Sequence, residues 1–466
     1  MTPQNMAAQS PPSSLTIRNP ATGSVVGTVA VTPVAEIDAV VARARAAQPA
    51  WAALGLDARA ACVKGAIATL KARAGEMGAL ACAEMGKPLK EAIGEAGYAN
   101  DSLGQEIDEI VAALRVELLE DEKTSTRLLF DPLGVAAVIT PWNFPILMPT
   151  QSVIPALIAG NTVVFKPSEV SPLSGDLWAR CMIEVLPPGV LQIIHGDGVQ
   201  GSALVRSAVD LVVFTGSRAT GAAIMRDASA GLKRLLLELG GKDPLIVLED
   251  ADIKAAAQFA VRNSFRNAGQ VCVSTERIYV ADKVADAFVQ AVVDGARALT
   301  QGDGACETTQ IGPMASARQK KIVMDQLRSA IADGAKCVVG ECDGANPSEG
   351  NFIRPTVLTG VTHAMSIMRD ETFGPVASIM RVSSDAEAVA LANDSPYGLG
   401  AAVYGSQARA TRVADQLTAG MVGINQGCGG ATGSPWVGAR QSGLGFHSGK
   451  YGHRQFAQVR SVSRAK

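Results

Sequence analysis

Residues 134–168 read GVAAVITPWNFPILMPTQSVIPALIAGNTVVFKPS and contain two short aliphatic runs separated by a segment of helix length. The first run is Val135–Ile139 and the second is Thr162–Phe165. Runs of β-branched and aliphatic residues of this length are typical of buried strands. A strand, a helix-length segment and a second strand in this order predict a parallel pair joined by a helical crossover.

The same alternation continues along most of the chain. Before Gly240-Gly241 the further runs are Val190–Ile194, Leu211–Phe214 and Leu235–Leu237; after it they are Leu245–Leu248, Arg277–Val280, Lys336–Val339, Val376–Val382, Gly400–Tyr404 and Met421–Asn425. This pattern predicts an α/β protein with two doubly wound, Rossmann-like sheets and a boundary near residue 241. Segments 123–133 and 455–466 belong clearly to neither sheet, so they are free to pair with each other or with another subunit.

Composition excludes several classes of function. The 466 residues carry 42 Lys and Arg against 44 Asp and Glu with no long run of one sign, which does not fit electrostatic binding of nucleic acid or of an anionic membrane. No apolar stretch reaches the length of a membrane span, and the first residues, MTPQNMAAQSPPSS, lack the parts of a targeting segment. We therefore expect a cytoplasmic protein with a small-molecule partner.

The eight cysteines include no CxxC pair and no neighbouring histidine at metal-ligand spacing. We therefore expect reduced thiols and no metal site.

Two glycine-rich turns are candidates for holding a nucleotide phosphate. Residues 196–201, GDGVQG, fit G-x-G-x-x-G, but the acidic residue expected at the end of the next strand is missing. That strand ends instead in residues 214–217, FTGS, where Gly216 and Ser217 open a helix and offer backbone N–H groups and a hydroxyl to a pyrophosphate. An ordinary turn between a strand and a helix explains either segment equally well, and no P-loop sequence is present.

A further polar group follows a predicted strand in residues 165–169, FKPSE, at the edge where open α/β sheets bind ligands. Lys166 is suited to bonding a ribose hydroxyl. Glu169 is suited to accepting from the 2′-hydroxyl of an adenosine ribose and to repelling a 2′-phosphate, which favours NAD over NADP. A solvated Lys/Glu pair on a loop is the simpler alternative.

Three residues have the chemistry of an acyl-transfer site. Cys272 follows Gly269, which permits a tight turn, and Glu238 ends an apolar strand, where desolvation raises the pKa of a carboxylate and suits it to general-base work. Asn143 lies in a loop between two prolines, where its amide is able to donate to a developing oxyanion. Each also has a purely structural interpretation: a small buried thiol, an ion-paired carboxylate and a turn amide.

Six segments resemble the aldehyde dehydrogenase superfamily in order and separation along nearly the whole chain: ITPWNFP (139–145), FKPSE (165–169), FTGS (214–217), LELGGK (237–242), GQVC (269–272) and ETFGP (371–375). The resemblance implies that Cys272 is the nucleophile, Glu238 the base for deacylation and Asn143 the oxyanion donor. The cofactor contacts that it implies are Thr140, Pro141, Trp142, Lys166, Ser168, Glu169, Gly198, Thr215, Gly216, Ser217, Leu239, Gly240, Glu371 and Phe373.

The resemblance also implies a domain organisation and a reaction. Residues 1–122 and 134–240 would form the NAD-binding domain, 241–454 the catalytic domain, and 123–133 with 455–466 a bridging element that joins a homodimer or homotetramer. The reaction is the NAD(P)-dependent oxidation of an aldehyde through a thiohemiacetal, hydride transfer and a thioester that water hydrolyses. Relatives that pass the acyl group to coenzyme A typically lack the glutamate at position 238.

The substrate funnel implied by the resemblance consists of Phe144, Met148, Gln151, Arg266, Val271 and Val273. Semialdehyde dehydrogenases usually hold the substrate carboxylate with two arginines; Arg266 matches one, and Gln151 replaces the other with a neutral donor. The small residues at 426–432, QGCGGAT, would widen the funnel. The expected substrate is therefore either a semialdehyde or a longer or aromatic aldehyde.

Two other functions remain as alternatives. One is a catalytically silent relative that acts as a binding or structural protein, against which the intact Cys272 and Glu238 argue. The other is a cysteine hydrolase without cofactor, which a dependence of the reaction on NAD would distinguish.

Overall fold

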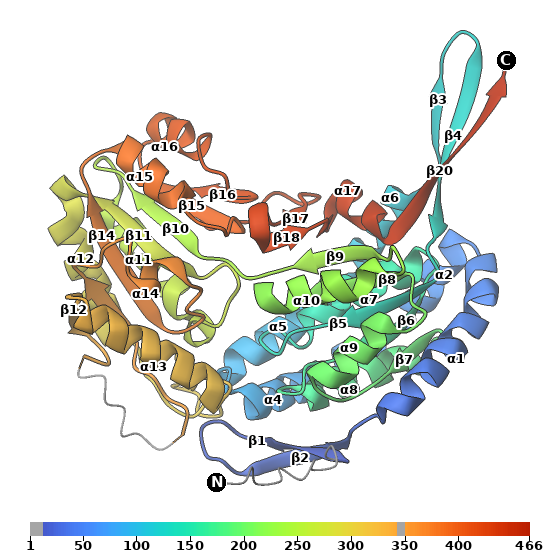
Figure 1. Cartoon of the computed structure of the whole chain (residues 1–466), viewed down its shortest axis with the longest axis horizontal. Coiled ribbons are helices and arrows are strands. Elements are labelled where there is room, and N and C mark those ends of the chain that lie inside the picture. The colour runs from blue at the N-terminus through green and yellow to red at the C-terminus, as the bar shows by residue number, and fades with distance from the viewer. Residues whose placement is uncertain (1–12, 343–349) are drawn as a thin grey trace, which may run out of the picture.

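Two α/β units lie side by side, each built on its own sheet, and a small third sheet projects from one end (Figure 1). The computed structural model describes residues 13–342 and 350–466, so the leader, residues 1–12, lies outside the described residues. The predicted class, α/β with two doubly wound and mainly parallel sheets, is confirmed.

The first sheet contains the strands predicted between residues 134 and 240. They are β5 (Val135–Ile139), β6 (Thr162–Lys166), β7 (Leu191–Ile193), β8 (Leu211–Thr215) and β9 (Arg234–Glu238). These strands are parallel in the spatial order β9-β8-β5-β6-β7. Every residue of β5 and β6 is buried, which explains why both strands have almost continuous apolar sequences.

Helices cover both faces of the first sheet. Helices α1 (Val34–Ala53), α9 (Gly198–Arg206) and α10 (Arg218–Ser229) share one apolar core with Val135 and Ala137 of β5. The other core contains Ala136 and Val138; its helices are α2 (Leu56–Lys64), α3 (Ile67–Ala72), α4 (Ala74–Met85), α5 (Leu89–Asp101), α6 (Leu103–Leu114), α7 (Leu147–Ile158) and α8 (Pro172–Ile183). Since successive strand residues point to opposite faces, β5 contributes to both cores.

The second sheet has the order β12-β13-β14-β11-β10-β15-β16. Its strands are β10 (Asp243–Val247), β11 (Thr275–Ala281), β12 (Lys336–Val339), β13 (Thr356–Thr359), β14 (Val376–Val382), β15 (Gly400–Tyr404) and β16 (Met421–Ile424). All neighbours are parallel except β12 and β13. The surrounding helices are α11 (Ile253–Phe265), α12 (Asp282–Arg297), α13 (Ala317–Ala332), α14 (Ser366–Arg369), α15 (Asp385–Asn393) and α16 (Gln407–Ala414).

The third sheet pairs the two segments that the sequence left unassigned. Strand β4 (Thr124–Pro132) is antiparallel to β20 (Ala457–Ala465) along its whole length, so these segments pair with each other. Strand β3 (Glu117–Glu120) adds to the other side of β4, so this sheet includes residues that precede the segment 123–133. The sheet order β20-β4-β3 leaves one open edge on each outer strand.

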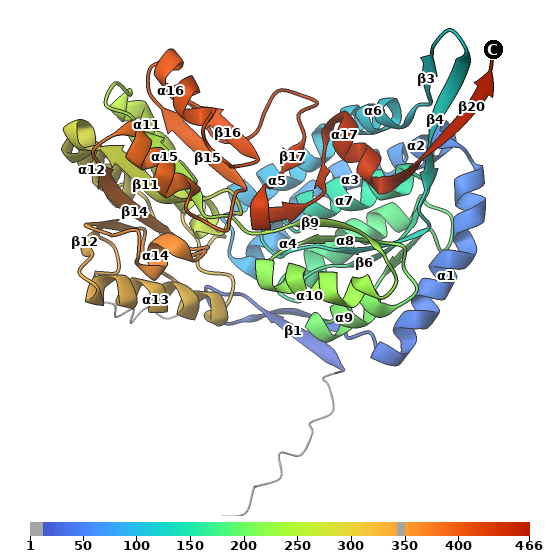
Figure 2. The ribbon, with the colours of Figure 1, turned by 45° about the horizontal axis from the view of Figure 1, so that its top comes forward.

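The C-terminal segment returns from the second unit to the first (Figure 2). It contains β17 (Trp436–Val437), β18 (Gly443–Leu444), β19 (Phe446–His447) and α17 (Gly449–His453). Strand β18 is antiparallel to β9, with Gly443 opposite Glu238, and β19 pairs with β17. A segment distant in sequence therefore covers the end of β9. An N-terminal hairpin, β1 (Ser14–Arg18) with β2 (Val25–Ala30), completes the sheets.

The expectation that all cysteines are reduced is wrong for one pair. Cys337 and Cys342 form a disulfide in the loop that follows β12, where the turn brings their Cα atoms within 5.0 Å. The other six cysteines, all in the described ranges, are free thiols. Among residues 13–342 and 350–466, no helix has the length and apolar character needed to cross a membrane.

Candidate active site

The strand order of the first sheet reverses at β5, because the chain goes from β5 to β6 and β7 on one side and then to β8 and β9 on the other. Open α/β sheets bind their ligands at the carboxyl ends of the strands beside such a switch point. Thr140, Pro141 and Trp142 follow β5, Lys166 ends β6, and Thr215 ends β8. The structure therefore brings these expected cofactor contacts to one edge of the first sheet.

Lys166 has the surroundings expected of a group that holds a polar ligand. Its side chain is buried, and its ammonium donates to the backbone oxygen of Pro167 at 3.2 Å. The carboxylate of Glu169 lies 3.8 Å away and is half exposed. Burial lowers the pKa of Lys166, and the charges of Glu169 and Asp197 oppose this shift. An ammonium has three donors, so Lys166 keeps hydrogen-bonding capacity for a ribose hydroxyl.

Ser168, another expected cofactor contact, is buried two residues after Lys166. Its hydroxyl accepts a hydrogen bond from the Val170 N–H.

The glycine-rich turns differ from the prediction in one respect. The N–H of Gly216 is not free for a phosphate, because it donates to the backbone oxygen of Glu238 at 3.0 Å as β8 pairs with β9. The hydroxyl of Ser217 accepts from the Thr220 N–H and caps α10, whose N-terminal dipole still points at this edge of the first sheet. Gly198 begins α9, and a side chain there would meet no other atom within 4 Å, so this turn is open.

Cys272 lies after an unusual turn between α11 and β11. Asn267, Ala268 and Gly269 all have positive φ, of 50°, 56° and 72°. A Cβ atom added to Gly269 would lie 2.0 Å from the backbone oxygen of Gly374, so only glycine fits against residues 371–375. Left-handed backbone at two non-glycine residues is costly and is concentrated at functional sites, and here it presents the thiol, which is half-buried.

Asn143 connects the loop after β5 to this turn. Its side-chain amide donates to the backbone oxygen of Gln270 at 3.0 Å, two residues before Cys272. Its own backbone oxygen accepts from Lys87 Nζ at 2.7 Å. Lys87 forms a fully buried ion pair with Glu95, which in turn accepts from the N–H groups of residues 146 and 147 at 3.0 Å. The Lys87–Glu95 pair therefore fixes the loop that carries Asn143, because it bonds both the Asn143 carbonyl and the N–H groups that follow.

Glu238 ends β9 at the same edge of the first sheet. The residue is buried, and burial raises the pKa of its carboxyl to about 8, while a hydrogen bond with Trp436 opposes the shift. The Nε2 atom of His447 lies 3.7 Å from Oε2 of Glu238. A carboxyl with a pKa in this range is suited to general-base work near neutral pH, as the sequence predicted.

The surroundings of the Cys272 thiol disfavour its thiolate form. Burial raises its pKa well above the usual value, and the charges of Glu238, Asp243 and Glu371 add to the shift. Since these charges act on the sulfur, the expected nucleophile and the expected base share one site. The structure therefore brings together all three residues expected to be catalytic.

The ETFGP segment reaches the site from the second unit. The carboxylate of Glu371 accepts from the Gly241 N–H at 3.1 Å, and a Cβ atom added to Gly240 would lie 2.3 Å from that carboxylate. Gly240 is therefore needed for the close approach of Glu371. Phe373 makes an edge-to-face contact with Trp142, with ring centres 5.5 Å apart. Leu239 was expected to contact the cofactor. Its side chain is buried and packs against Gly221 of α10.

A buried ion pair holds this segment in place. Glu276 accepts from Lys242 Nζ and from the N–H groups of Thr372 and Phe373, at 2.7 to 2.8 Å. Lys242 also donates to the Thr372 hydroxyl at 2.9 Å.

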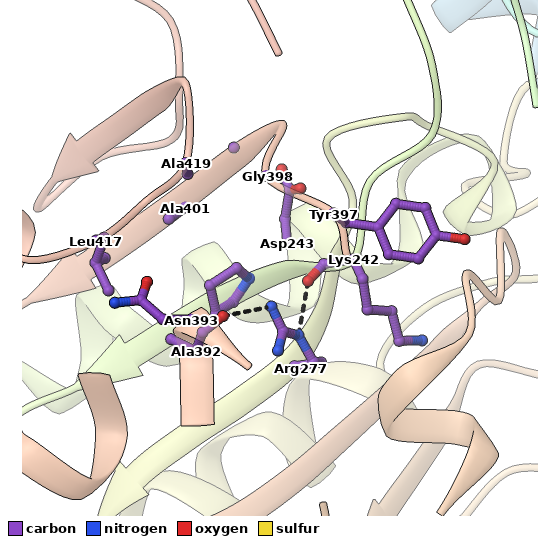
Figure 3. A pocket seen from close by; sticks show the side chains of 12 residues that line it. Lys242, Asp243, Arg277, Ala392, Asn393, Tyr397, Gly398, Ala401, Leu417 and Ala419 are labelled. Atoms are coloured by element: carbon purple, nitrogen blue, oxygen red, sulfur yellow. Dashed lines mark hydrogen bonds between the residues drawn. The ribbon is translucent and has the colours of Figure 1, made fainter. Parts of the chain in front are cut away.

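A small cavity in the second unit is lined by a buried acid, Asp243 (Figure 3). A Cβ atom added to Gly241 would lie 2.5 Å from Oδ1 of Asp243 and 2.6 Å from the backbone oxygen of Cys272, so these two oxygens are neighbours. Among the described residues no side chain bonds this carboxylate, and burial raises its pKa well above the usual value. Arg277, which also lines the cavity, donates instead to the backbone oxygens of Lys242 and Ala392.

The expected funnel residues lie on two elements that meet at Phe144. Met148 and Gln151 are half-buried on α7, and Arg266 is exposed at the end of α11, with its guanidinium 5.6 Å from the centre of the Phe144 ring. Val271 is buried and Val273 half-buried on either side of Cys272. Glu91, which is half-buried, interacts electrostatically with Arg266.

The comparisons with known proteins agree with this geometry. The sequence model of the aldehyde dehydrogenase family matches residues 6–462. The chain belongs to the aldehyde dehydrogenase family. It is 36% identical over 459 residues to the glutarate-semialdehyde dehydrogenase of Pseudomonas putida, which covers 96% of this chain and 93% of that protein.

Solved structures of this aldehyde dehydrogenase family superpose closely. An NADP-dependent enzyme of E. coli has a TM-score of 0.93 at 33% identity and covers 97% of this chain and 95% of its own. Betaine aldehyde dehydrogenase of Staphylococcus aureus, solved in complex with NAD+, has a TM-score of 0.90 at 32% identity over 97% of this chain and 91% of that one. The protein is therefore an NAD(P)-dependent oxidoreductase that oxidises aldehydes.

Several residues of this aldehyde dehydrogenase's site escaped the sequence analysis. Lys87 lies outside the six segments that carry the family resemblance, and the partner residues Glu95 and Glu276 carry no local pattern. His447 and Trp436 lie in strands of two residues each, which are too short to be recognised. A buried lysine or glutamate needs a partner, but sequence alone does not show which one.

Proposed function

We propose that this aldehyde dehydrogenase forms a covalent thiohemiacetal between the Cys272 sulfur and the carbonyl carbon of its substrate. The observation that carries the proposal is the bond from Asn143 to the Gln270 carbonyl, which places the side-chain amide beside the nucleophile loop. An amide nitrogen has two hydrogens, so the second is available to the oxyanion, together with the Cys272 N–H. Attack requires the thiolate, so the thiol proton first passes to water.

The nicotinamide cofactor fits the edge of the first sheet at the carboxyl ends of β5, β6 and β8. Lys166, Ser168 and Glu169 would hold the adenosine ribose, and the N-terminus of α10 at Ser217 would face the pyrophosphate. Thr140, Pro141 and Trp142 with Thr215 would line this edge. Glu371 and Phe373 would bound the nicotinamide end beside Gly240. When bound, the cofactor accepts the hydride that leaves the thiohemiacetal carbon.

Glu238 would complete the cycle as a general base. Its carboxylate takes a proton from water, the resulting hydroxide adds to the thioester carbon, and the Cys272 sulfur leaves as the carboxylic acid forms. The raised pKa makes Glu238 a stronger base than an ordinary carboxylate. The retained glutamate supports water rather than coenzyme A as the acceptor.

We propose a semialdehyde as the substrate. The exposed guanidinium of Arg266 at the Phe144 ring offers one charged partner for a distal carboxylate, and Gln151 adds a neutral donor from α7. The similarity to a glutarate-semialdehyde dehydrogenase supports this class. Glu91 neutralises part of the Arg266 charge, which weakens the attraction of Arg266 for a substrate carboxylate. Longer or aromatic aldehydes therefore remain the second candidate.

NAD is the cofactor that we expect this site to prefer. The half-exposed Glu169 carboxylate stands next to Lys166, and its charge would repel a 2′-phosphate. Lys166 supplies a compensating positive charge, so NADP is a second cofactor rather than an excluded one.

We also propose that a second copy of this chain covers the third sheet. Its outer strands have open edges, and Val116, Leu118, Leu119 and Val459 expose more than half of their surface there. Unpaired edges with exposed apolar side chains favour association with another strand.

The proposal is tested by NADH formation with purified protein across glutarate semialdehyde, succinate semialdehyde, hexanal and benzaldehyde, with Cys272→Ala as the control. We expect turnover with NAD, a preference for the two semialdehydes, and none with Cys272→Ala. Preference for hexanal or benzaldehyde would overturn the substrate assignment. Hydrolysis without any need for NAD would support the hydrolase alternative.

A further inference from the structure

A second titratable side chain, that of His447, lies next to Glu238. Strand β18 pairs with β9 at Glu238, and the chain then continues into β19, which ends in His447. The Nε2 atom of His447 is 3.7 Å from Oε2 of Glu238, and the side chains are 9% and 11% exposed. This separation is longer than a hydrogen bond, so the two groups are close neighbours that are not bonded to each other in the structure.

The other ring nitrogen of His447 contacts the next residue in the chain. Its Nδ1 atom is 2.8 Å from the hydroxyl oxygen of Ser448, which is half-buried. Ser448 has φ of 61° and ψ of 156°, a conformation that glycine alone adopts readily. This costly backbone holds the hydroxyl against the imidazole. Glu238, His447 and Ser448 therefore form a line from the buried carboxylate towards the surface.

The surroundings keep the imidazole neutral. Trp436 stacks on His447 with ring centres 6.4 Å apart and also bonds Glu238. The titratable groups that face His447 are Glu238 on β9 and His453 on α17. Burial lowers the pKa of His447 to about 3, and the charge of His453 adds to this shift. A neutral imidazole has one free lone pair, which is the requirement for accepting a proton.

We propose that His447 carries away the proton that Glu238 takes from the hydrolytic water and passes it through Ser448 to solvent. This inference rests on the proposed role of Glu238 as the base. The imidazole accepts the proton from Glu238 at Nε2 as the proton on Nδ1 passes to the Ser448 oxygen, whose own hydroxyl proton goes to bulk water, so the ring stays neutral and no imidazolium forms. Glu238 is then ionised again, and the water oxygen remains in the carboxylic acid.

The test isolates thioester hydrolysis and needs neither cofactor nor aldehyde. The Cys272 thiol is acetylated with 4-nitrophenyl acetate, excess reagent is removed, and loss of the acetyl group is followed by intact-protein mass. We expect His447→Gln to acetylate as fast as the parent and to hydrolyse at least about tenfold more slowly, because glutamine bonds but carries no proton. The matched control is His195→Gln, a half-buried histidine bonded to Asp176 away from Glu238.

A second variant separates proton transfer from a structural effect. His447→Ala should also hydrolyse slowly, and added imidazole should restore the rate in proportion to its concentration, which a packing defect would not show. If Glu238→Gln hydrolyses at the parent rate, the proposed base is wrong and the relay falls with it. The relay is overturned, and the role of Glu238 as base is kept, by either of two results. One is slow hydrolysis in Glu238→Gln with parent-rate hydrolysis in His447→Gln. The other is slow hydrolysis in Glu238→Gln with no restoration of the His447→Ala rate by imidazole.

Discussion

The side-chain amide of Asn143 donates a 3.0 Å hydrogen bond to the backbone oxygen of Gln270. These residues lie in loops beside different sheets: Asn143 follows β5 of the first sheet, and Gln270 precedes β11 of the second. Asn267 strengthens the connection by donating to both Gln270 and Asn143 oxygens, at 3.2 and 3.4 Å. One side chain thus sets the position of the proposed oxyanion donor relative to the nucleophile.

Asn143→Ala removes that donor. We expect kcat for aldehyde oxidation to fall by about 10²- to 10³-fold, the usual effect of losing one oxyanion donor. The measurement is steady-state NADH formation with the best aldehyde of the panel. Asn100→Ala is the matched control, because Asn100 is also a buried amide with one bond to a backbone oxygen, that of Leu70. Equal losses in both variants would show that Asn143 acts only through stability.

Hydrolysis of the acetyl thioester should depend on pH through Glu238. Only the carboxylate is a base, and its pKa is raised to about 8. The rate should therefore rise about tenfold per pH unit below pH 8 and level off above it. Glu238→Gln should give a slow and nearly flat profile over the same range. A parent profile that is already level at pH 6 would contradict the raised pKa.

Lys87→Met leaves the buried carboxylate of Glu95 without its partner. The free energy of unfolding should fall by about 3 to 5 kcal/mol, the usual cost of breaking a buried ion pair. Because Lys87 also holds the Asn143 carbonyl, kcat should fall in the protein that still folds. The matched control is Lys64→Met, which removes the exposed pair with Asp108 and should cost less than about 1 kcal/mol in a urea titration.

Glu169→Ser removes the carboxylate expected to repel a 2′-phosphate. The ratio of kcat/KM for NADP to that for NAD should rise about tenfold, equivalent to about 1.4 kcal/mol. Glu184→Ser, which removes an exposed glutamate at the end of α8, should leave the ratio unchanged. An unchanged ratio in Glu169→Ser would count against its place at the ribose.

The oligomeric state should depend on the third sheet. Val459→Asp and Leu119→Asp put charges on the exposed apolar surface of β20 and β3, so we expect a lower mass by light scattering. Ile322→Asp is the control, since Ile322 is an exposed apolar residue on α13 of the second unit. A parent protein that is already monomeric would refute the proposed association.

Much of the fold was predictable because parallel strands are buried on both faces. Strands such as β5 and β14 therefore have apolar runs that end where the strands end. Strand β13 was missed because it has only four residues, two of them threonine. The hairpin of β1 and β2 was missed because one face is exposed and its polar residues interrupt the pattern.

Site residues that lie within a contiguous sequence motif could be predicted. Site residues that depend on contacts between segments distant in sequence could not. Cys272, Glu238 and Asn143 were candidates from their own segments, and the structure brings them close together. Glu95 and His447 act through partners brought near by the fold, as when β18 returns to β9. Gly216 shows the reverse case: its sequence suggested a free N–H, but pairing of β8 with β9 uses that donor.

The most direct test of the mechanism is to trap the thioester. Glu238→Gln is mixed with NAD and glutarate semialdehyde, quenched, digested and analysed by mass spectrometry, with NADH measured in parallel. We predict one NADH per subunit in a single burst and an acyl group on the peptide that contains Cys272. Continuous turnover at the parent rate, or an acyl group on any other cysteine, would contradict the assignment of Cys272 and Glu238.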